Sequence, residues 1–202
     1  MSSETARIEA FSDGVFAIAI TLLILEIKVP QPAAGPLAGQ LLRQWPSYVS
    51  YVISFVFIGI MWTNHHRLFN HIRRSDSGLM LLNLLLLLGV TFVPYPTSVL
   101  AAQLGHPDER LAVLIFNGSY FFIAIFFNLL WRYATSRKRQ LVASETDAGE
   151  IDGITRQYAF GPVSYLACVG LAFVSVDASL ALNFALACFF ALPPKVLKDH
   201  RG

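Results

Sequence analysis

Long apolar windows without a charged residue alternate along this chain with short polar segments. The charge-free windows cover residues 14–25, 44–66, 79–105, 111–131, 157–176 and 178–194. A helix needs about 20 apolar residues to cross the hydrocarbon core of a bilayer. The segment 79–92 is apolar on every face and lacks the strict alternation of a barrel strand. The pattern therefore predicts an all-α membrane protein.

Six transmembrane helices are expected, one for each window. Their predicted bounds are residues 7–29, 45–66, 79–101, 110–133, 156–175 and 178–195. The first window spans only about 18 Å at 1.5 Å per residue. The first helix therefore crosses only if Phe11, Ser12 and Asp13 at one end, and Glu26 and Lys28 at the other, remain helical. Short connections leave no room for a second domain, which predicts a single six-helix transmembrane domain over residues 1–202.

Composition supports this class. Hydrophobic residues make up 55% of the chain and charged residues 14%, whereas soluble domains carry about 25% charged residues. A soluble core with loops, a disordered chain, a disulfide scaffold and a nucleic-acid binder are excluded. The sequence also lacks a P-loop, a G-x-S-x-G motif, an H-E-x-x-H motif and an intramembrane carboxylate pair. We therefore expect neither an enzyme nor a bound cofactor.

The basic residues predict an orientation. Twelve of the 15 lie in segments on the side of the N-terminus, and the other three are Lys28, Arg43 and Arg110. Cytoplasmic loops carry the excess of Lys and Arg in membrane proteins. Both termini are therefore expected in the cytoplasm, which agrees with an even number of spans.

One apolar stripe runs along the predicted first helix. At about 100° per residue, seven residues fall within about 60° of Ile18, and they are Phe11, Gly14, Ile18, Thr21, Leu22, Leu25 and Val29. Ser12 and Asp13 point to the opposite side. Such a stripe is most often lipid-facing or packed against a neighbour. Charged residues at both helix ends, with a carboxylate on the back face, favour a place inside an assembly, because ionisable groups near the membrane face protein or water.

A second polar cluster, from Trp62 to Arg67 with His71 beyond it, ends the predicted second helix. Adjacent His residues suggest a metal site only weakly, because neighbours on a helix point about 100° apart and no Cys or carboxylate completes the set. We expect these groups to hydrogen-bond to Ser12 and Asp13 at the same membrane depth. Titration of His near neutral pH leaves a proton-sensing role open.

Three segments carry a family resemblance. Residues 7–28 read RIEAFSDGVFAIAITLLILEIK, residues 62–69 read WTNHHRLF, and residues 83–88 read NLLLLL. They resemble the transmembrane protein 175 family, whose first helix bears an R-x-x-x-F-S-D motif. Members of this family are potassium channels, lysosomal in animals and with single-repeat homologues in bacteria. The single repeat of this chain is similar to the bacterial form, which implies a homotetramer in the bacterial cytoplasmic membrane.

The resemblance also implies roles for individual residues. The first helix of each subunit would line a central pore with a hydrophobic constriction at Ile18, Leu22 and Leu25. Thr21 would form a hydroxyl layer. Glu26, at about 80° from Ile18 on the helical wheel, is our own expectation for the outer mouth, where it would enrich cations. An interhelical polar network would hold the pore helix, and its members are Arg7, Phe11, Ser12, Asp13, Trp62, His65 and His66. Potassium ions would be the permeant, with the lipid bilayer and further copies of the chain as partners and no nucleic acid.

The expected function is therefore passive conduction of potassium. The chain lacks the T-V-G-Y-G filter, so a ring of backbone carbonyls does not explain selectivity. Two alternatives stay open: a small secondary transporter, for which the Pro94 and Pro96 break is the sole support, and a membrane scaffold that does not conduct.

Overall fold

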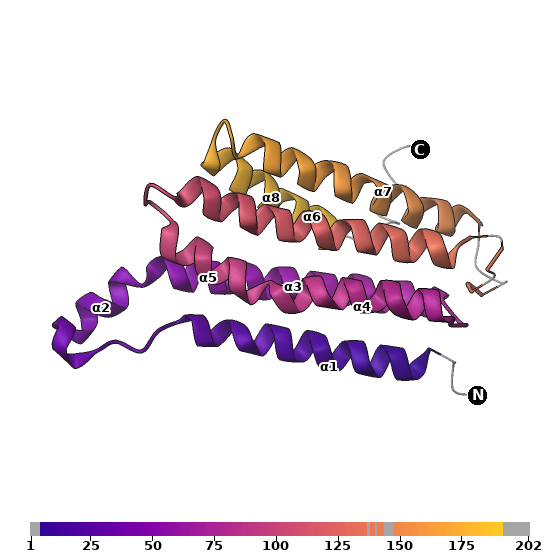
Figure 1. Cartoon of the computed structure of the whole chain (residues 1–202), viewed down its shortest axis with the longest axis horizontal. Helices are drawn as coiled ribbons and strands as arrows, with labels where there is room; N and C mark the ends of the chain where they lie inside the picture. Colours follow the sequence, from indigo (N-terminus) through magenta and orange to yellow (C-terminus); the bar gives the residue numbers. More distant parts are fainter. Residues whose placement is uncertain (1–4, 137, 140, 144–147, 192–202) are drawn as a thin grey trace.

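The structure, a computed structural model, describes residues 5–136, 138–139, 141–143 and 148–191. The first helix, α1, covers Ala6–Leu22 and continues as a 3-10 turn over Leu23–Glu26. A short 3-10 turn at Pro32–Ala34 then leads to the next helices (Figure 1). These are α2 (Leu37–Arg43), α3 (Trp45–His71), α4 (Ser77–Phe92), α5 (Pro94–Gln103), α6 (Glu109–Ala134), α7 (Ala148–Leu171) and α8 (Val176–Ala191).

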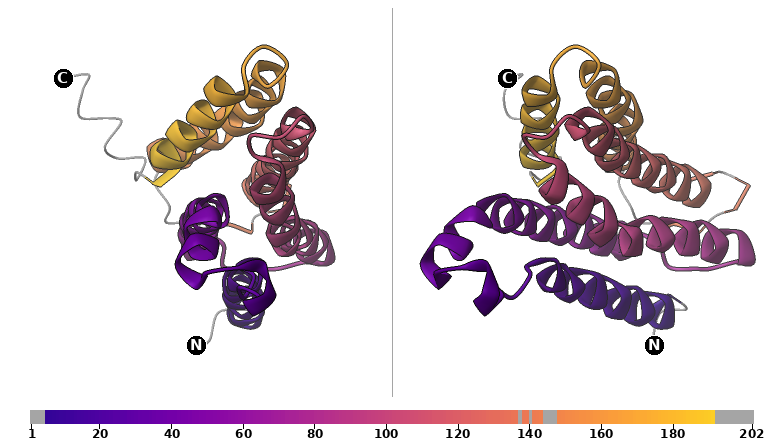
Figure 2. Two further views of the ribbon diagram at one scale, coloured as in Figure 1. Left: turned by 90° about the vertical axis from the view of Figure 1, so that its left-hand side faces the viewer. Right: turned by 60° about the vertical axis from the view of Figure 1, so that its left-hand side comes forward.

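The long helices run roughly along one axis and pack around α6. This helix contacts α4, α5, α7 and α8, while α3 lies between α1 and the C-terminal pair α7 and α8 (Figures 1 and 2). The end-on view shows α1 at one edge of the bundle. Its main helix partners are α3 and α4. One side of α1 is therefore packed, and the described residues leave its other side uncovered.

The prediction of six transmembrane spans is wrong. Within the described residues, four helical segments are long and apolar enough to cross a membrane: Ala6–Glu26, Trp45–His71, Ser77–Gln103 and Glu109–Ala134. The fifth predicted span belongs to α7, which begins eight residues earlier than expected and includes Glu150, Asp152 and Arg156. The sixth belongs to α8, an apolar helix of 16 residues. The predicted end of that span, residues 192–195, lies outside the described residues.

Proline breaks the third span into α4 and α5. Pro94 has no N–H to donate to the preceding turn, so the helical ladder is interrupted there. The hydroxyl of Thr97 donates to the carbonyl of Val93 at 2.8 Å and, since that uses its proton, accepts from Ser54 of α3 at 2.7 Å. This buried hydroxyl pair ties the segment after the proline break to α3, so both hydroxyls have a partner inside the bundle.

A carboxylate joins α4 to α6 at the end of the bundle nearest the N-terminus. The Asp76 side chain caps α4 by accepting from the backbone N–H of Leu79 at 2.8 Å. It also accepts from the Tyr133 hydroxyl at 3.0 Å and from Arg139 at 3.3 Å. The Leu79 N–H, followed by the Tyr133 hydroxyl and the Arg139 charge, holds the pKa of Asp76 below its ordinary value. The residues after α6 are thereby tied to the start of α4.

The contact between α4 and α6 depends on a glycine. A Cβ atom at Gly89 would lie 2.7 Å from Cγ1 of Ile123 and 2.9 Å from Cδ1 of Phe122. These distances are shorter than van der Waals contact, so any side chain at this position would push the two helices apart.

We expect Gly89→Ala to lower the free energy of unfolding by about 1–3 kcal/mol, because overpacking a well-packed core has that cost. Thermal unfolding in detergent would measure the loss. Gly118→Ala on α6 is the matched control, since nothing lies within 4 Å of the added Cβ. An equal or higher melting temperature for Gly89→Ala would contradict the close approach of the two helices.

Candidate pore helix

A narrow seam of α1 holds the helix on the bundle. Its buried members are Ser12, Phe16, Ala19 and Leu23, which are at most 2% exposed. Their spacing of four, three and four residues places them on one face of a helix. Ser12 and Ala19 are small and Phe16 and Leu23 are apolar, and through this face α1 contacts α3 and α4. This seam fixes which side of α1 is left facing outward.

A directed chain of hydrogen bonds crosses from α3 through α4 to α1. His65 Nε2 lies 2.8 Å from Asn83 Oδ1, which can only accept, so this ring nitrogen donates. Asn83 Nδ2 donates to the hydroxyl of Ser12 at 3.0 Å, and Ser12 donates to the carbonyl of Ile8 at 2.8 Å. His65, Asn83 and Ser12 are all nearly fully buried. Each therefore depends on the others for its hydrogen bonds.

A second, more exposed link joins α1 to α3. The indole Nε1 of Trp62 donates to Asp13 Oδ1 at 2.8 Å. His66 stacks on the Trp62 ring with a centroid distance of 6.2 Å, while His65 lies between the rings of Phe16 and Phe69. The two adjacent histidines thus face different surroundings. No group of three potential metal ligands occurs in the part of the chain that the structure describes.

The residues expected to line a pore lie on the uncovered side of α1. Ile18 is 58% exposed, Leu22 43% and Leu25 63%. Phe11 on the same stripe is 55% exposed, and no atom lies within 4 Å of a Cβ built at Gly14. Within the described residues, the stripe is left exposed as a surface for lipid or for a further copy of the chain.

The C-terminal end of α1 changes from an α-helix to a 3-10 turn. Residues Leu23–Glu26 form a 3-10 turn and Ile27 is extended. Lys28 is therefore not helical, contrary to the prediction. Instead Lys28 Nζ donates to the Leu25 carbonyl at 3.2 Å. Because residues three apart eclipse each other in a 3-10 turn, Leu25 lies above Leu22. Glu26 is rotated further from the stripe than a regular α-helix predicts and is partly buried.

The Thr21 hydroxyl donates its hydrogen bond within α1. The hydroxyl lies 2.9 Å from the carbonyl oxygens of both Ala17 and Ile18 and donates to them. Its lone pairs therefore face away from α1, where Thr21 is exposed. Such an oxygen can accept a hydrogen bond or contact a cation.

Asn83 is the residue whose part in this site was not expected. The sequence indicates a hydrogen-bonding role for it in general terms, because it is the one polar side chain in a leucine run. It does not indicate that Asn83 joins Ser12 to His65. Arg7, expected in the polar network, is exposed and lines an open groove with Phe11 and Asn83.

The architecture and this site define a class: an α-helical integral membrane protein with an N-terminal helix attached through buried polar contacts. Residues 7–94 match the family model described as endosomal/lysosomal potassium channel TMEM175. A potassium channel of Chamaesiphon minutus is 51% identical over 193 residues, covering 94% of this chain and 95% of that protein. A potassium channel of Streptomyces collinus is 46% identical over 191 residues, covering 93% and 92%.

A solved structure agrees with these sequences. The crystal structure of a lysosomal potassium-selective channel TMEM175 homologue from Chamaesiphon minutus superposes with a TM-score of 0.84 at 49% identity. The match covers 95% of this chain and 98% of that one. The chain belongs to the TMEM175 family, and the resemblance predicted from residues 7–28, 62–69 and 83–88 is confirmed.

We expect Asn83→Ala to destabilise the protein by about 1–3 kcal/mol, because it leaves the buried Ser12 and His65 without their partner. The melting temperature in detergent would fall by several degrees. Asn70→Ala, at an exposed position near the end of α3, is the control and should change stability by less than about 0.5 kcal/mol. Similar effects of the two variants would show that the hydrogen-bond chain does not hold α1.

Proposed function

We propose that this protein is a potassium channel whose pore is lined by α1 from several copies of the chain. The observation that carries the proposal is the outward stripe of α1, in which Ile18, Leu22 and Leu25 are all large, apolar and exposed. The bacterial relatives described as potassium channels match nearly the full length of the chain. A single helix at the edge of a bundle does not enclose a pore, so the pore requires self-association.

The proposed assembly is a homotetramer in the cytoplasmic membrane of a bacterium, with both termini in the cytoplasm. A closed ring with cyclic symmetry presents the same helix face to the central axis from every copy. The excess of basic residues on the side of the N-terminus supports the orientation. The polar links of α1 to α3 and α4 would hold each pore helix at a fixed rotation about its axis.

The proposed constriction consists of three apolar rings, at Ile18, Leu22 and Leu25. The first and last lie about 12 Å apart, at about 1.5 Å per residue in the α-helix and about 2.0 Å in the 3-10 turn. A narrow apolar passage of this kind gates by dewetting, since water leaves it when it is too narrow. The 3-10 turn supports this arrangement because it stacks Leu25 over Leu22 instead of spreading the two around the helix.

Thr21 would supply the polar layer next to these rings. Its proton is donated to Ala17 and Ile18, so the oxygen presents lone pairs toward a passing cation. Four such oxygens would replace part of the hydration shell of potassium. Glu26 at the outer mouth stays a prediction from the sequence, and its rotation away from the stripe gives it a lesser part than the three apolar residues.

Purified protein in sealed liposomes tests the function against its alternatives. A channel gives potassium flux down its gradient that does not saturate at low concentration, whereas a transporter saturates and couples its flux to a second solute. A scaffold gives no flux. Saturating, coupled flux or no flux would overturn the proposal, and so would a purified species with the mass of one subunit in the conducting preparation.

We expect Ile18→Asn to increase leak current and to weaken the preference for potassium over sodium, because a polar ring keeps the constriction wet. Planar bilayer recordings with defined ion gradients would measure both. Leu81→Asn on α4 is the matched control, since Leu81 is also 58% exposed. Unchanged currents and ion ratios for Ile18→Asn would remove Ile18 from the pore.

A further inference from the structure

Basic residues gather at the end of the bundle where α1 begins (Figure 1). Two segments supply them: residues 72–76, between α3 and α4, and residues 132–143, at the end of α6 and in the loop after it. Together these segments contain a single acidic residue and six basic ones, which are Arg73, Arg74, Arg132, Arg137, Lys138 and Arg139. All but Arg137 lie within the described residues, and those five are exposed. We call these five residues the basic surface.

Backbone pairing brings the two segments together. Ile72 and Val142 form an antiparallel bridge. The Leu141 carbonyl accepts from the backbone N–H of Arg73 at 2.9 Å and from that of Arg74 at 3.2 Å. The side chains of Ile72 and Leu141 are at most 5% exposed. The pairing therefore rests on a buried apolar contact and leaves the two arginine side chains exposed beside the loop.

The positive charges of this surface are only partly neutralised by the chain. Asp76 is the acidic residue of the two segments, and Arg139 is one of its three hydrogen-bond donors, at 3.3 Å. No ion pair joins Arg73, Arg74 or Lys138 to a carboxylate within the described residues. Three exposed cations therefore lie side by side with no carboxylate from the described part of the chain opposite them.

The basic surface lies at the depth of lipid headgroups. The apolar segment of α3 ends at His71, that of α4 begins at Ser77, and that of α6 ends at Ala134. Each member of the surface is therefore within about five residues of the end of a candidate span. Arg132 lies two residues inside its span, and its long apolar stem lets the guanidinium reach the headgroups.

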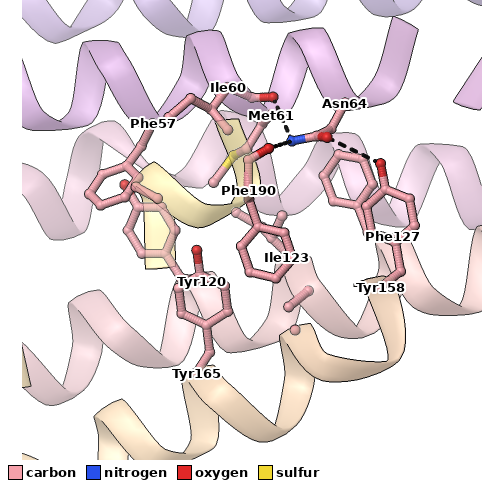
Figure 3. A pocket seen from close by; sticks show the side chains of 13 residues that line it. Phe57, Ile60, Met61, Asn64, Tyr120, Ile123, Phe127, Tyr158, Tyr165 and Phe190 are labelled. Atoms are coloured by element: carbon pink, nitrogen blue, oxygen red, sulfur yellow. Dashed lines mark hydrogen bonds between the residues drawn. The ribbon is translucent and has the colours of Figure 1, made fainter. Parts of the chain in front are cut away.

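The nearby end of α3 is held to the C-terminal helices. Asn64 of α3 donates to the Phe190 carbonyl at 3.0 Å and accepts from the Tyr158 hydroxyl at 3.3 Å. These contacts border a small aromatic cavity of about 50 Å³ between α3, α6, α7 and α8, which Tyr165 also lines (Figure 3). Arg67 donates to Asn64 Oδ1 at 3.2 Å. The charge of Arg67 is thus bound within the chain and does not belong to the basic surface.

We propose that the basic surface binds the phosphate groups of anionic phospholipids in the cytoplasmic leaflet, with Arg73, Arg74 and Lys138 as the main contacts. Basic groups beside the cytoplasmic end of a span attract anionic headgroups, and arginine and lysine donate charge-assisted hydrogen bonds to phosphate. The Thr5 hydroxyl, just before α1, lies 3.5 Å from the Ile72 carbonyl. A bound headgroup would therefore hold the loop and the linker next to the start of α1. The proposal rests on the membrane orientation proposed above and needs neither conduction nor a particular number of subunits.

Thermal unfolding of the full-length protein in a neutral detergent tests the proposal. We expect phosphatidylglycerol to raise the melting temperature by several degrees more than phosphatidylcholine at the same mole fraction, because a ligand of the folded state stabilises it. The difference should shrink in about 1 M salt, where the screening length falls to about 3 Å. Equal shifts for the two lipids would overturn the proposal and would indicate that another group, such as the acidic residues of the same loop, covers the surface.

Substitution of the three main contacts locates the site. We expect the triple variant Arg73→Gln, Arg74→Gln and Lys138→Gln to bind phosphatidylglycerol at least about tenfold more weakly, since each basic residue near an anionic surface contributes about fivefold. The matched control replaces by Gln three exposed basic residues at the opposite end of the bundle, which are Lys28, Arg43 and Arg110. It removes the same charge and should bind within twofold of wild type. Equal losses for the two triple variants would contradict the assignment, and Lys138→Gln alone, with an expected loss of about fivefold, serves if the first triple variant does not fold.

Two further measurements separate lipid from other anions and binding from stability. Soluble glycerol phosphate carries the same phosphate without acyl chains, and we expect no rise in melting temperature at a concentration equal to that of the lipid. A rise as large as that with phosphatidylglycerol would indicate a site for a soluble anion and would overturn the proposal. Mass spectrometry of the protein released from micelles counts the phosphatidylglycerol molecules that stay bound, and an unchanged count for the Arg73, Arg74 and Lys138 variant would also contradict it.

Discussion

The hydrogen-bond chain from His65 through Asn83 to Ser12 is the interaction on which the placement of α1 depends. Among the described residues, helix α1 is packed on one side, and the three residues of this hydrogen-bond chain are buried on that side. In an apolar setting each of these groups must find a partner or bear the cost of desolvation. Rotation of α1 by even one residue would break the bonds. The outward direction of Ile18 and Leu22 therefore follows from the inward direction of Ser12.

The same constraint shapes the rest of the bundle. Next to the proline break, Ser54 of α3 is hydrogen-bonded to Thr97 of α5 at 2.7 Å, and the Phe190 carbonyl near the end of α8 accepts from Asn64 of α3. Between α6, α7 and α8, Asn117, Ser179 and the Cys168 carbonyl bond to one another. In each case a polar side chain of one helix serves another helix. Such bonds contribute about 1 kcal/mol each in membranes. They also fix the register of one helix against the next, which apolar contacts alone would not specify.

The number of spans shows where a pattern of charges misleads. A window without charge is necessary for a span but does not measure how apolar the window is. The window at 157–176 contains Gln157, Tyr158 and Pro162, and α7 reaches back into a charged segment that the window excluded. The window at 178–194 is apolar, but the described part of α8 is short. The positions of charged residues do not report the length of a helix or the polarity of its uncharged residues. These two properties explain why the fifth and sixth predicted spans were wrong.

The family motif was readable because its residues are close in sequence, and it led to the family without any structure. The outward stripe was readable as well, because the period of an α-helix holds from Phe11 to Leu22. Beyond Leu22 the 3-10 turn changes the period, so the predicted direction of Glu26 and the helical state of Lys28 were not reliable. No local pattern signals that tightening.

The sequence by itself determined that the chain is a helical membrane protein, where its helices approximately lie, and which face of α1 is apolar, since these depend on charge and periodicity along one segment. Only the tertiary structure decided that Asn83 joins Ser12 to His65, that Trp62 binds Asp13, and that four helices enclose an aromatic cavity around Tyr165. Those contacts join residues up to 126 positions apart. Partners so distant are set by packing between helices, and no spacing along the chain encodes them.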